Sequence, residues 1–210
     1  MIRILIADDH PIVRAGLRQI VAEAADMVVA AEAADGHEVL TQVRGSDFDV
    51  VLLDLTIPGL SGLDVLKQLK VERPNLRVLI LSVHPEDQYA IRVLRAGAWG
   101  YVTKASAPEQ LIGAIRKVHE GRRYVSPTLA ERLADQLEGG AATMPHEGLS
   151  DREYQVLCLL ASGKTVTEIA AALALSVKTV STYRARILEK MGMRSNAELT
   201  HYAIQNRLVD

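Results

Sequence analysis

The first 120 residues alternate between two kinds of segment, and this alternation restricts the fold more than any other feature of the sequence. Short runs rich in Val, Ile and Leu are each followed by a longer segment with apolar residues at helical spacing. Such an alternation predicts a parallel sheet covered by helices on both faces, because each crossover connection is a helix. We therefore expect a doubly wound, five-stranded α/β domain, with strands at residues 3–7, 28–32, 49–53, 77–83 and 98–103.

The sequence changes character after Gly121, where the strand pattern stops. Residues 126–138 predict one more helix, and GGAATMPHEG at residues 139–148 has the Gly and Pro content of a flexible linker. Only helical patterns follow the linker, which predicts a small all-α domain at the end of the chain. The expected boundaries are 1–121 for the α/β domain, 122–148 for a linker helix and flexible linker, and 149–210 for the helical domain.

Capping residues mark where several of the predicted helices begin. A Ser or Thr followed three residues later by Glu predicts a capping box, in which each side chain accepts a hydrogen bond from the other residue's backbone N–H. Ser176 is expected to act as a single cap. Capping boxes are predicted at Ser106 with Glu109, Ser150 with Glu153, Thr165 with Glu168, and Ser195 with Glu198.

Charge and cysteine content limit the partners and the compartment. The formal net charge is only -2, so any attraction to nucleic acid must come from a local basic patch. The single cysteine, Cys158, cannot form an internal disulfide, which fits a reducing cytoplasm and a role in core packing. No apolar stretch approaches the roughly 18 residues of a membrane span, and the N-terminus lacks a secretion-signal layout. We expect a cytoplasmic protein without a membrane partner.

Three carboxylates follow the predicted strands at their carboxyl ends. Asp8 and Asp9 come directly after the first strand, and Asp54 ends the third in DVVLLDL. Because the carboxyl ends of parallel strands meet at one edge of a sheet, these acids are expected to converge. Like charges this close are costly without a cation, and an oxygen-only cluster suits Mg²⁺. An Asp-Asp pair after a strand is, however, usually a helix cap or a solvated turn.

Two further groups are expected at the same edge. LILSV ends near the hydroxyl of Ser82, and GYVTK ends at Lys104. A carboxylate, a metal ion, a hydroxyl and an ammonium would together form a phosphoryl site, with Asp54 as the attacking group. Taken singly, Ser82 fits an ordinary strand serine, Lys104 a solvated lysine and Tyr101 a core aromatic. The phosphoryl-site interpretation depends on their falling at the same end of four different strands.

The helical domain contains a candidate DNA-binding helix. Helices starting at Thr165 and Val177 are separated by the short turn LALS, in the manner of a helix-turn-helix. The second helix carries four basic residues against Glu189 alone, which predicts a basic outward face. An ordinary amphipathic helix with solvated charges would show the same pattern. The basic residues are Lys178, Arg184, Arg186 and Lys190.

Residues 2–120 closely resemble the receiver domain of two-component response regulators, which has a flavodoxin-like fold. The resemblance is carried by ADDHP, LLDLTIPGLSG, LILSVH and RAGAWGYVTK. One departure is Val83, where many receivers have a small residue, and it implies tighter access to the phosphoryl group. The resemblance implies that Asp54 is the phosphoacceptor and that Lys104 binds the phosphoryl group. It also implies that Asp9 and Asp54 ligate Mg²⁺ directly, that Asp8 holds metal-bound water, and that Thr56 offers its backbone carbonyl to the ion. By the same resemblance, Ser82 and Tyr101 are the switch residues.

The segment from Leu149 to the C-terminus resembles the LuxR-type helix-turn-helix, and together with the receiver it resembles the NarL/FixJ class of transcriptional regulators. The carrying motif is LSDREYQVLCLLASGKTVTEIAAALALSVKTVSTYRARILEKMG. Ala185 could offer only an apolar contact, for instance to a thymine methyl. The implied DNA-facing residues are Lys178, Ser181, Thr182 and Ala185, accompanied by Arg184 and Arg186, and the implied dimerisation residues of the last helix are Asn196, Leu199, Tyr202 and Ala203.

The resulting prediction is a DNA-binding transcription factor switched by Mg²⁺-dependent phosphorylation of Asp54. The implied partners are a sensor histidine kinase as phosphodonor, double-stranded promoter DNA, a second copy of the chain when phosphorylated, and RNA polymerase. The receiver would catalyse only its own phosphorylation and dephosphorylation, so the chain is not expected to be an enzyme. One alternative is a phosphatase or phosphotransferase of the haloacid-dehalogenase type, but such enzymes need an acid where this chain has Thr56. The other is a phosphorylation-independent regulator that works through protein contacts.

Overall fold

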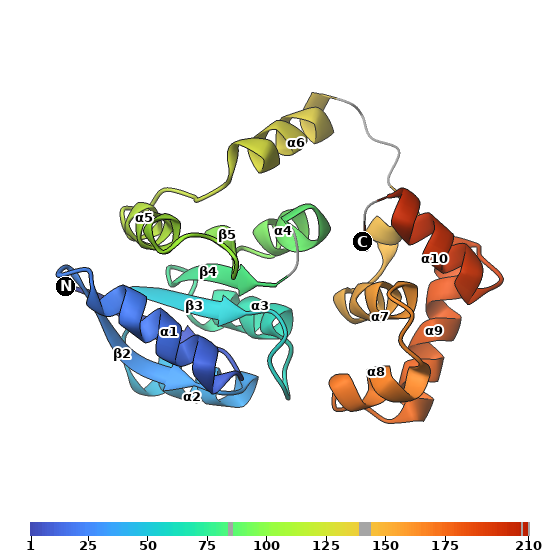
Figure 1. The fold of residues 1–210 in the computed structure, drawn as a ribbon, viewed down its shortest axis with the longest axis horizontal. Coiled ribbons are helices and arrows are strands. Elements are labelled where there is room, and N and C mark those ends of the chain that lie inside the picture. Colours follow the sequence, from blue (N-terminus) through green and yellow to red (C-terminus); the bar gives the residue numbers. More distant parts are fainter. Residues whose placement is uncertain (84–85, 139–143, 207, 210) are drawn as a thin grey trace. The chain divides into compact units, whose positions relative to one another are not determined.

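The computed structural model describes residues 1–83, 86–138, 144–206 and 208–209 (Figure 1). The chain divides into two compact units, Met1–Ala130 and Glu131–Asp210, which are described separately below. The division falls inside the segment 122–148 that the sequence predicts as the linker. Among the described residues, no helix is both long and apolar enough to cross a membrane.

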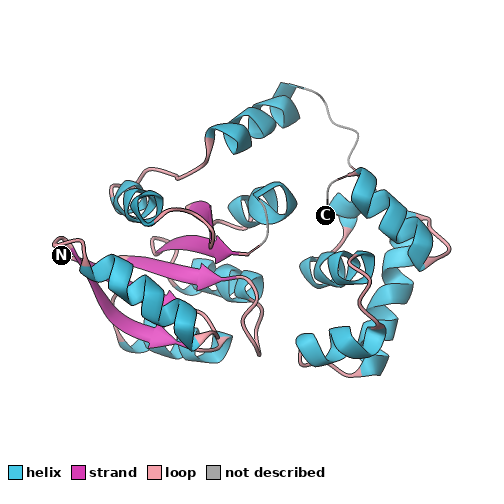
Figure 2. Cartoon of the chain, viewed as in Figure 1, coloured by secondary structure: helices cyan, strands magenta, loops and turns pink. Residues whose placement is uncertain are grey.

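The first unit contains a parallel sheet with strand order β2-β1-β3-β4-β5 (Figure 2). This confirms the five-stranded α/β prediction, and the strand ends differ from the predicted ones by at most two residues. The central strands form where apolar runs are buried on both faces: every residue of β3 is buried. The strands are β1 (Ile2–Ala7), β2 (Met27–Ala33), β3 (Val50–Asp54), β4 (Arg77–Ser82) and β5 (Gly100–Thr103).

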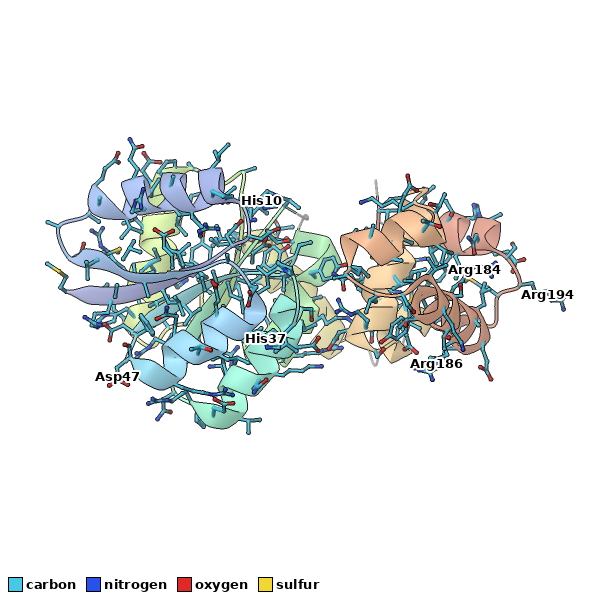
Figure 3. The ribbon with its side chains drawn as sticks, turned by 90° about the horizontal axis from the view of Figure 1, so that it is seen from below. His10, His37, Asp47, Arg184, Arg186 and Arg194 are labelled. Carbon is cyan, nitrogen blue, oxygen red and sulfur yellow. The ribbon has the colours of Figure 1, made fainter. Side chains whose placement is uncertain are left out.

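Helices cover both faces of the sheet. One face packs against α1 and α5, whose buried residues, such as Leu17 and Ile115, share a core with Ile4 and Leu52 of the strands. Helices α2 and α3 contact each other on the opposite face, below the strands in Figure 3. The helices of this unit are α1 (Pro11–Ala22), α2 (Gly36–Gly45), α3 (Gly62–Glu72), α4 (Glu86–Arg95) and α5 (Pro108–His119), and the division between the units falls within α6 (Pro127–Glu138).

The predicted capping box at the start of α5 is wrong. The N-cap residue is Ala107, which has no side-chain cap, and Pro108 begins the helix. The Ser106 hydroxyl lies 2.9 Å from the Thr103 hydroxyl instead. Proline at the first helical position has a fixed φ and lacks the N–H that a cap would satisfy, so the helix can start one residue later than the Ser–Glu spacing suggests.

The second unit is helical, as predicted, with α7 (Asp151–Ala161), α8 (Val166–Ala172), α9 (Val177–Met191) and α10 (Asn196–Gln205). The capping boxes at Ser150 and Thr165 are confirmed, and Ser176 caps α9 by accepting the N–H of Thr179. The box at Ser195 is only half correct. Ser195 accepts the N–H of Glu198, but the Glu198 carboxylate accepts the N–H of Arg194.

The end of the predicted flexible linker is folded. Residues 139–143 lie outside the described residues, whereas Pro145–Gly148 forms a short 3-10 helix. His146 Nδ1 lies 2.7 Å from the hydroxyl oxygen of Tyr202 in α10. The Pro and Gly of this stretch therefore shape a turn that is attached to the second unit, so the linker prediction is wrong for Pro145–Gly148.

Candidate functional site

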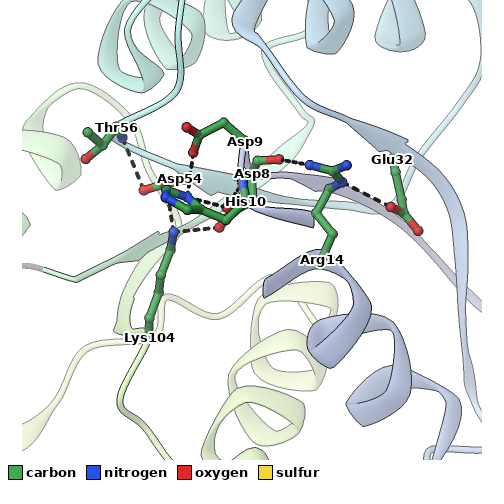
Figure 4. A network of polar contacts seen from close by, with 8 residues as sticks. All are labelled: Asp8, Asp9, His10, Arg14, Glu32, Asp54, Thr56 and Lys104. Atoms are coloured by element: carbon green, nitrogen blue, oxygen red, sulfur yellow. Dashed lines mark hydrogen bonds and ion pairs between the residues drawn. The ribbon is translucent and has the colours of Figure 1, made fainter. Parts of the chain in front are cut away.

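The three carboxylates meet where β1 and β3 end. Ala7 pairs with Leu53 across the sheet, which places the turn after β1 beside Asp54, the last residue of β3. Ligand atoms of Asp8, Asp9, His10 and Asp54 all lie within 4.8 Å of one another (Figure 4). Asp8 and Asp54 are almost completely buried, and Asp9 is half-buried. The predicted convergence of the three acids is confirmed.

Lys104 joins two of these carboxylates. Its Nζ lies 2.6 Å from Oδ2 of Asp8 and 2.8 Å from Oδ2 of Asp54. Burial lowers the pKa of Lys104, but the hydrogen bonds with Asp54 and Asp8 outweigh burial, so the net shift is upward. Burial raises the pKa of Asp54, and the charge of Asp8 adds to this, against the opposing effect of Lys104 and the Thr56 N–H. The single positive charge of Lys104 therefore does not neutralise the negative charge of the acidic cluster.

The donor set fits a hard divalent cation. Asp8 Oδ2 and Asp9 Oδ1 are buried carboxylate oxygens, and they face Lys104 Nζ at 2.6 Å and His10 Nδ1 at 2.8 Å respectively. Several buried or half-buried carboxylates that share a single ammonium group favour the binding of a further cation. Mg²⁺ prefers oxygen ligands and commonly uses one or two carboxylates while keeping waters. The residues present thus suit Mg²⁺ at the position that the sequence predicts.

The turn after β3 holds Asp54 from the other side. The backbone N–H of Thr56 donates to Asp54 Oδ1 at 3.1 Å, while the Thr56 side chain is exposed. Gly62, at the start of α3, lies so close to β3 that a Cβ there would be 2.1 Å from the Asp54 carbonyl oxygen. Gly59 adopts a φ of 75°, which glycine tolerates at little cost. The predicted tight turn is therefore present, and Gly62 is needed for its close approach.

Sequence reasoning missed two residues that support the acids. His10 Nδ1 lies 2.8 Å from Asp9 Oδ1, and the His10 N–H donates to Asp8 Oδ1 at 2.9 Å. Arg14 donates from Nη1 to the Asp8 carbonyl oxygen at 2.6 Å and from Nε to Glu32 at 3.1 Å, which attaches the turn to β2 (Figure 4). His10 was visible inside the DDHP motif, whereas the pairing of Arg14 with Glu32 depends on the register of β1 and β2.

Ser82 lies on β4, which is beside β3, and Tyr101 lies on β5, which pairs with β4. Ser82 ends β4 opposite Thr103, and its carbonyl accepts the N–H of Lys104 at 2.7 Å. Both side chains are fully buried, and both have partners within the structure. Val83 is 68% exposed, so its side chain points largely toward solvent. The structure brings the hydroxyl, the lysine and the acids to one edge; their assigned roles stay predictions.

In the second unit, α9 presents most of its predicted DNA-facing residues to solvent. Val180, Ile187 and Met191 are buried on the inner face of the helix. Arg184 differs from the expectation: it is half-buried, and its Nε donates to Asn196 Oδ1 at 2.6 Å. The exposed members of the predicted set are Lys178, Ser181, Thr182, Ala185 and Arg186 (Arg184 and Arg186 are labelled in Figure 3).

Lys190, counted in the sequence as part of the basic face, bonds instead within the domain. Its Nζ lies 2.6 Å from Oε2 of Glu153, and the same oxygen accepts the N–H of Ser150 at 2.8 Å. Glu153 is buried, with 3% of its surface exposed. The pair therefore joins α9 to the start of α7, so Lys190 has a structural contact that the charge pattern could not reveal.

The four dimerisation candidates on α10 face their own domain. Leu199 and Ala203 are fully buried in it, so they are not surface contacts and that part of the prediction is wrong. Asn196 accepts the hydrogen bond from Arg184, and the Tyr202 hydroxyl contacts His146. A small helical domain needs the apolar side of each helix for its own core. Ile204 is a large apolar residue of α10 that is exposed, at 54%.

Two family models match the chain, one for each unit. The response regulator receiver domain matches residues 4–116. The luxR family of bacterial regulatory proteins matches residues 147–203. The chain belongs to the response regulators of the NarL/FixJ class.

Whole-length relatives agree with this assignment. The response regulator UvrY of Escherichia coli strain K12 is 37% identical over 209 residues, covering 99% of this chain and 96% of the relative. The response regulator GacA of Pseudomonas aeruginosa is 37% identical over 211 residues, covering 100% and 99%. Among solved structures, Salmonella enterica serovar Typhimurium RcsB bound to promoter P1flhDC with the phosphomimetic BeF3- is 29% identical, covers 96% of this response regulator and 97% of that chain, and has a TM-score of 0.67.

Proposed function

We propose that this response regulator accepts a phosphoryl group on Asp54 from the phosphohistidine of a sensor kinase, and that the phosphoryl group controls dimerisation and promoter binding. The observation that carries the proposal is the bridge from Lys104 to Asp8 and Asp54 within a cluster of buried carboxylates. A lysine that contacts the acceptor carboxylate can contact phosphoryl oxygens once they are attached to it.

Each residue around Asp54 has a distinct task in the transfer. Thr56 fixes Oδ1 through its N–H and leaves Oδ2 toward Lys104, so the carboxylate is oriented before the donor arrives. Asp54 attacks phosphorus, the P–N bond of the phosphohistidine breaks, and the imidazole takes up a proton from solvent. Lys104 then donates to the phosphoryl oxygens and offsets part of their charge.

Mg²⁺ would be held directly by Asp9, Asp54 and the Thr56 carbonyl, with Asp8 holding metal-bound water. When bound, the ion supplies charge neutralisation on the transferring group. The raised pKa of Asp54 supports a role for the ion. Burial and the charge of Asp8 disfavour the charged form of Asp54, and a cation in the cluster would favour that charged form again. Arg14 and His10 keep the Asp8–Asp9 turn in place for that purpose.

The switch is proposed to run through Ser82 and Tyr101. A phosphoryl group brings about two negative charges, and a hydrogen bond from Ser82 to it is worth roughly 1.5–3 kcal/mol. Converting a population from about 1:99 to 99:1 needs roughly 5.5 kcal/mol, so Lys104 and the metal must also contribute. Because Tyr101 is fully buried, movement of Ser82 would let it repack and change the face formed by α4, β5 and α5.

Promoter DNA is proposed to lie against the exposed face of α9. Lys178 and Arg186 are exposed and suited to phosphate, while Ser181, Thr182 and Ala185 are exposed and small enough to approach base edges. The solved RcsB structures bound to promoters support this assignment by analogy. A second copy of the chain and RNA polymerase are the further partners proposed, with the exposed Ile204 a candidate contact of the dimer.

The test of the phosphoacceptor is intact-mass measurement after incubation with acetyl phosphate and Mg²⁺. Wild-type protein should gain one phosphoryl group, and Asp54→Asn should gain none. Asp47→Asn is the matched control, because the Asp47 side chain is 91% exposed and precedes β3 at the opposite end of the strand from Asp54. Full modification of Asp54→Asn would refute the assignment.

A further inference from the structure

A second charged cluster lies at the other end of the sheet, around Trp99. The Lys70 ammonium and the guanidinium groups of Arg77 and Arg123 lie 5.9, 5.7 and 5.9 Å from the centroid of the Trp99 ring. They come from the end of α3, the start of β4 and the segment after α5, so the fold, not local sequence, assembles them. We call these four residues the basic–aromatic cluster.

The three cations of the cluster have no carboxylate within ion-pair distance among the described residues. Lys70 donates to the carbonyl oxygens of Pro74 and Leu76, and Arg123 donates to that of Ala98. Other surface cations of this unit do have such partners: Arg44 pairs with Glu72, Arg73 with Asp47, and Arg116 with Asp26.

The uncompensated charge changes the chemistry of Lys70. Burial, followed by the charges of Arg123 and Arg77, lowers its pKa to about 8. Aromatic contacts offset only part of such repulsion, because a cation–π interaction contributes roughly 0.5–2 kcal/mol. Bringing three cations together without an acid therefore disfavours the charged state of Lys70, and an anion at the cluster would reverse that effect.

Arg77 also has a side-chain nitrogen without a hydrogen-bond partner. Its Nε is buried and has no hydrogen-bond acceptor. Its side chain also lines an open cavity of about 310 Å³. The cavity's three carboxylates have other partners: Asp47 pairs with Arg73, Glu72 pairs with Arg44, and Asp49 accepts the backbone N–H of Arg3. The guanidinium thus borders a space that a small anion could enter.

We propose that the basic–aromatic cluster binds a small phosphate-bearing anion. Each guanidinium group can donate two parallel hydrogen bonds to one anion, and the ammonium adds a compact positive charge. This combination suits a multiply charged phosphate ligand better than a ligand with a single carboxylate. Because the cations already lie against the Trp99 ring, the ligand is recognised through its phosphate and not by stacking on the indole.

The proposed site is separate from the Asp54 site and does not depend on its function. Trp99 directly precedes β5, whereas Lys104 directly follows it. A strand rises by about 3.3 Å per residue, so the two sites lie roughly 16 Å apart at opposite edges of the sheet.

The test uses Trp99 itself as the reporter, since it is the single tryptophan of the chain. The full chain is titrated with inorganic pyrophosphate in the absence of Mg²⁺, and in parallel with sodium chloride at matched ionic strength. We expect a saturable change in tryptophan emission with pyrophosphate only. ATP should bind with similar affinity, since the phosphates are what the cluster contacts. A linear response, or one that chloride reproduces, would overturn the proposal.

Variants identify the residues involved, with calorimetric titration as a second measurement because these side chains touch the reporter. Arg77→Gln and Lys70→Gln should each weaken pyrophosphate binding about tenfold, the equivalent of one charge-assisted hydrogen bond. Arg77→Lys keeps the charge and should retain more affinity than Arg77→Gln. Arg116→Gln is the matched control, because Arg116 is engaged with Asp26 and neither residue lines the cavity, and it should bind as wild type does. Loss of binding in Lys104→Gln with full binding in Arg77→Gln would place the anion at Asp54 and refute the cluster.

Discussion

The Glu153–Lys190 pair offers a quantitative test of how the DNA-binding domain is held together. The change is Glu153→Gln, which keeps the size of the side chain and an oxygen that can accept the Ser150 N–H, but removes the charge that holds Lys190. A hydrogen bond to a charged group contributes about 1.5–3 kcal/mol. Because the Lys190 side chain is 45% exposed and can return to water, the expected loss lies near the lower limit, about 1.5 kcal/mol.

This loss should appear as a lower melting temperature of the helical domain. For a domain of this size, 1 kcal/mol shifts the midpoint by about 4–8 °C, so roughly 6–12 °C is expected. Calorimetry of the full chain measures the shift, and Trp99 fluorescence reports separately on the receiver, whose midpoint should not change. Glu189→Gln is the matched control: the same chemical change at an exposed position of α9 should cost less than about 0.5 kcal/mol.

The pH dependence provides a second check on the same pair. Burial raises the pKa of Glu153, but the hydrogen bonds from Lys190 and Ser150 lower it by more, so it lies below its usual value of 4.5. A carboxyl group with a depressed folded-state pKa stabilises the fold above its unfolded-state pKa, and this stability is lost as the pH falls through the folded-state value. The difference between wild type and Glu153→Gln should be full at pH 7 and shrink below about pH 4.5. A difference that is absent at neutral pH, or that grows on acidification, would refute the reasoning.

Three further outcomes are expected. Lys104→Ala removes the ion pairs with Asp8 and Asp54 but should still fold, since a lysine at the end of a strand contributes little to the apolar core. Its DNA affinity should respond poorly to phosphorylation of Asp54, and an unchanged response would exclude the proposed phosphoryl contact. Gly62→Ala should destabilise the receiver by about 2–4 kcal/mol in denaturant unfolding followed by tryptophan emission, because the added Cβ would lie 2.1 Å from the Asp54 carbonyl oxygen; wild-type stability would show that the turn relaxes freely. If a dimer places about six basic side chains on phosphates, DNA affinity should fall roughly 10³-fold between 50 and 200 mM salt, and a salt-independent affinity would contradict phosphate contacts.

The sheet and the acidic edge could be predicted because their causes are local in sequence. Strands buried on both faces read as continuous apolar runs, and parallel strands must bring their carboxyl ends together, so Asp8, Asp9 and Asp54 were expected to meet. Lys104 was expected at the same edge, because it also follows the carboxyl end of a predicted strand. What could not be predicted is which partner each side chain chooses, because that depends on register and helix packing.

Several residues show this limit. Arg14 contacts Glu32 only because β2 lies beside β1. The three cations around the Trp99 ring come from separate parts of the sequence, so their contacts depend on the fold. Lys190 looked like part of a basic DNA-facing helix until the packing of α9 on α7 placed it against Glu153. Leu199 fits an apolar interface equally well whether the neighbour is a second chain or its own domain, and the structure shows that it is buried in its own domain.

The measurement that tests the central claim most directly is DNA affinity and assembly of the intact protein with and without phosphorylation at Asp54. Promoter duplexes recovered by genomic mapping of binding sites supply the DNA, and sedimentation supplies the assembly state. Phosphorylated wild type should shift from monomer toward dimer and bind the duplex more tightly, whereas Asp54→Asn treated in the same way should match unphosphorylated wild type in both measurements. If unphosphorylated wild type already equals the phosphorylated form in both assembly and affinity, phosphorylation of Asp54 is not the switch.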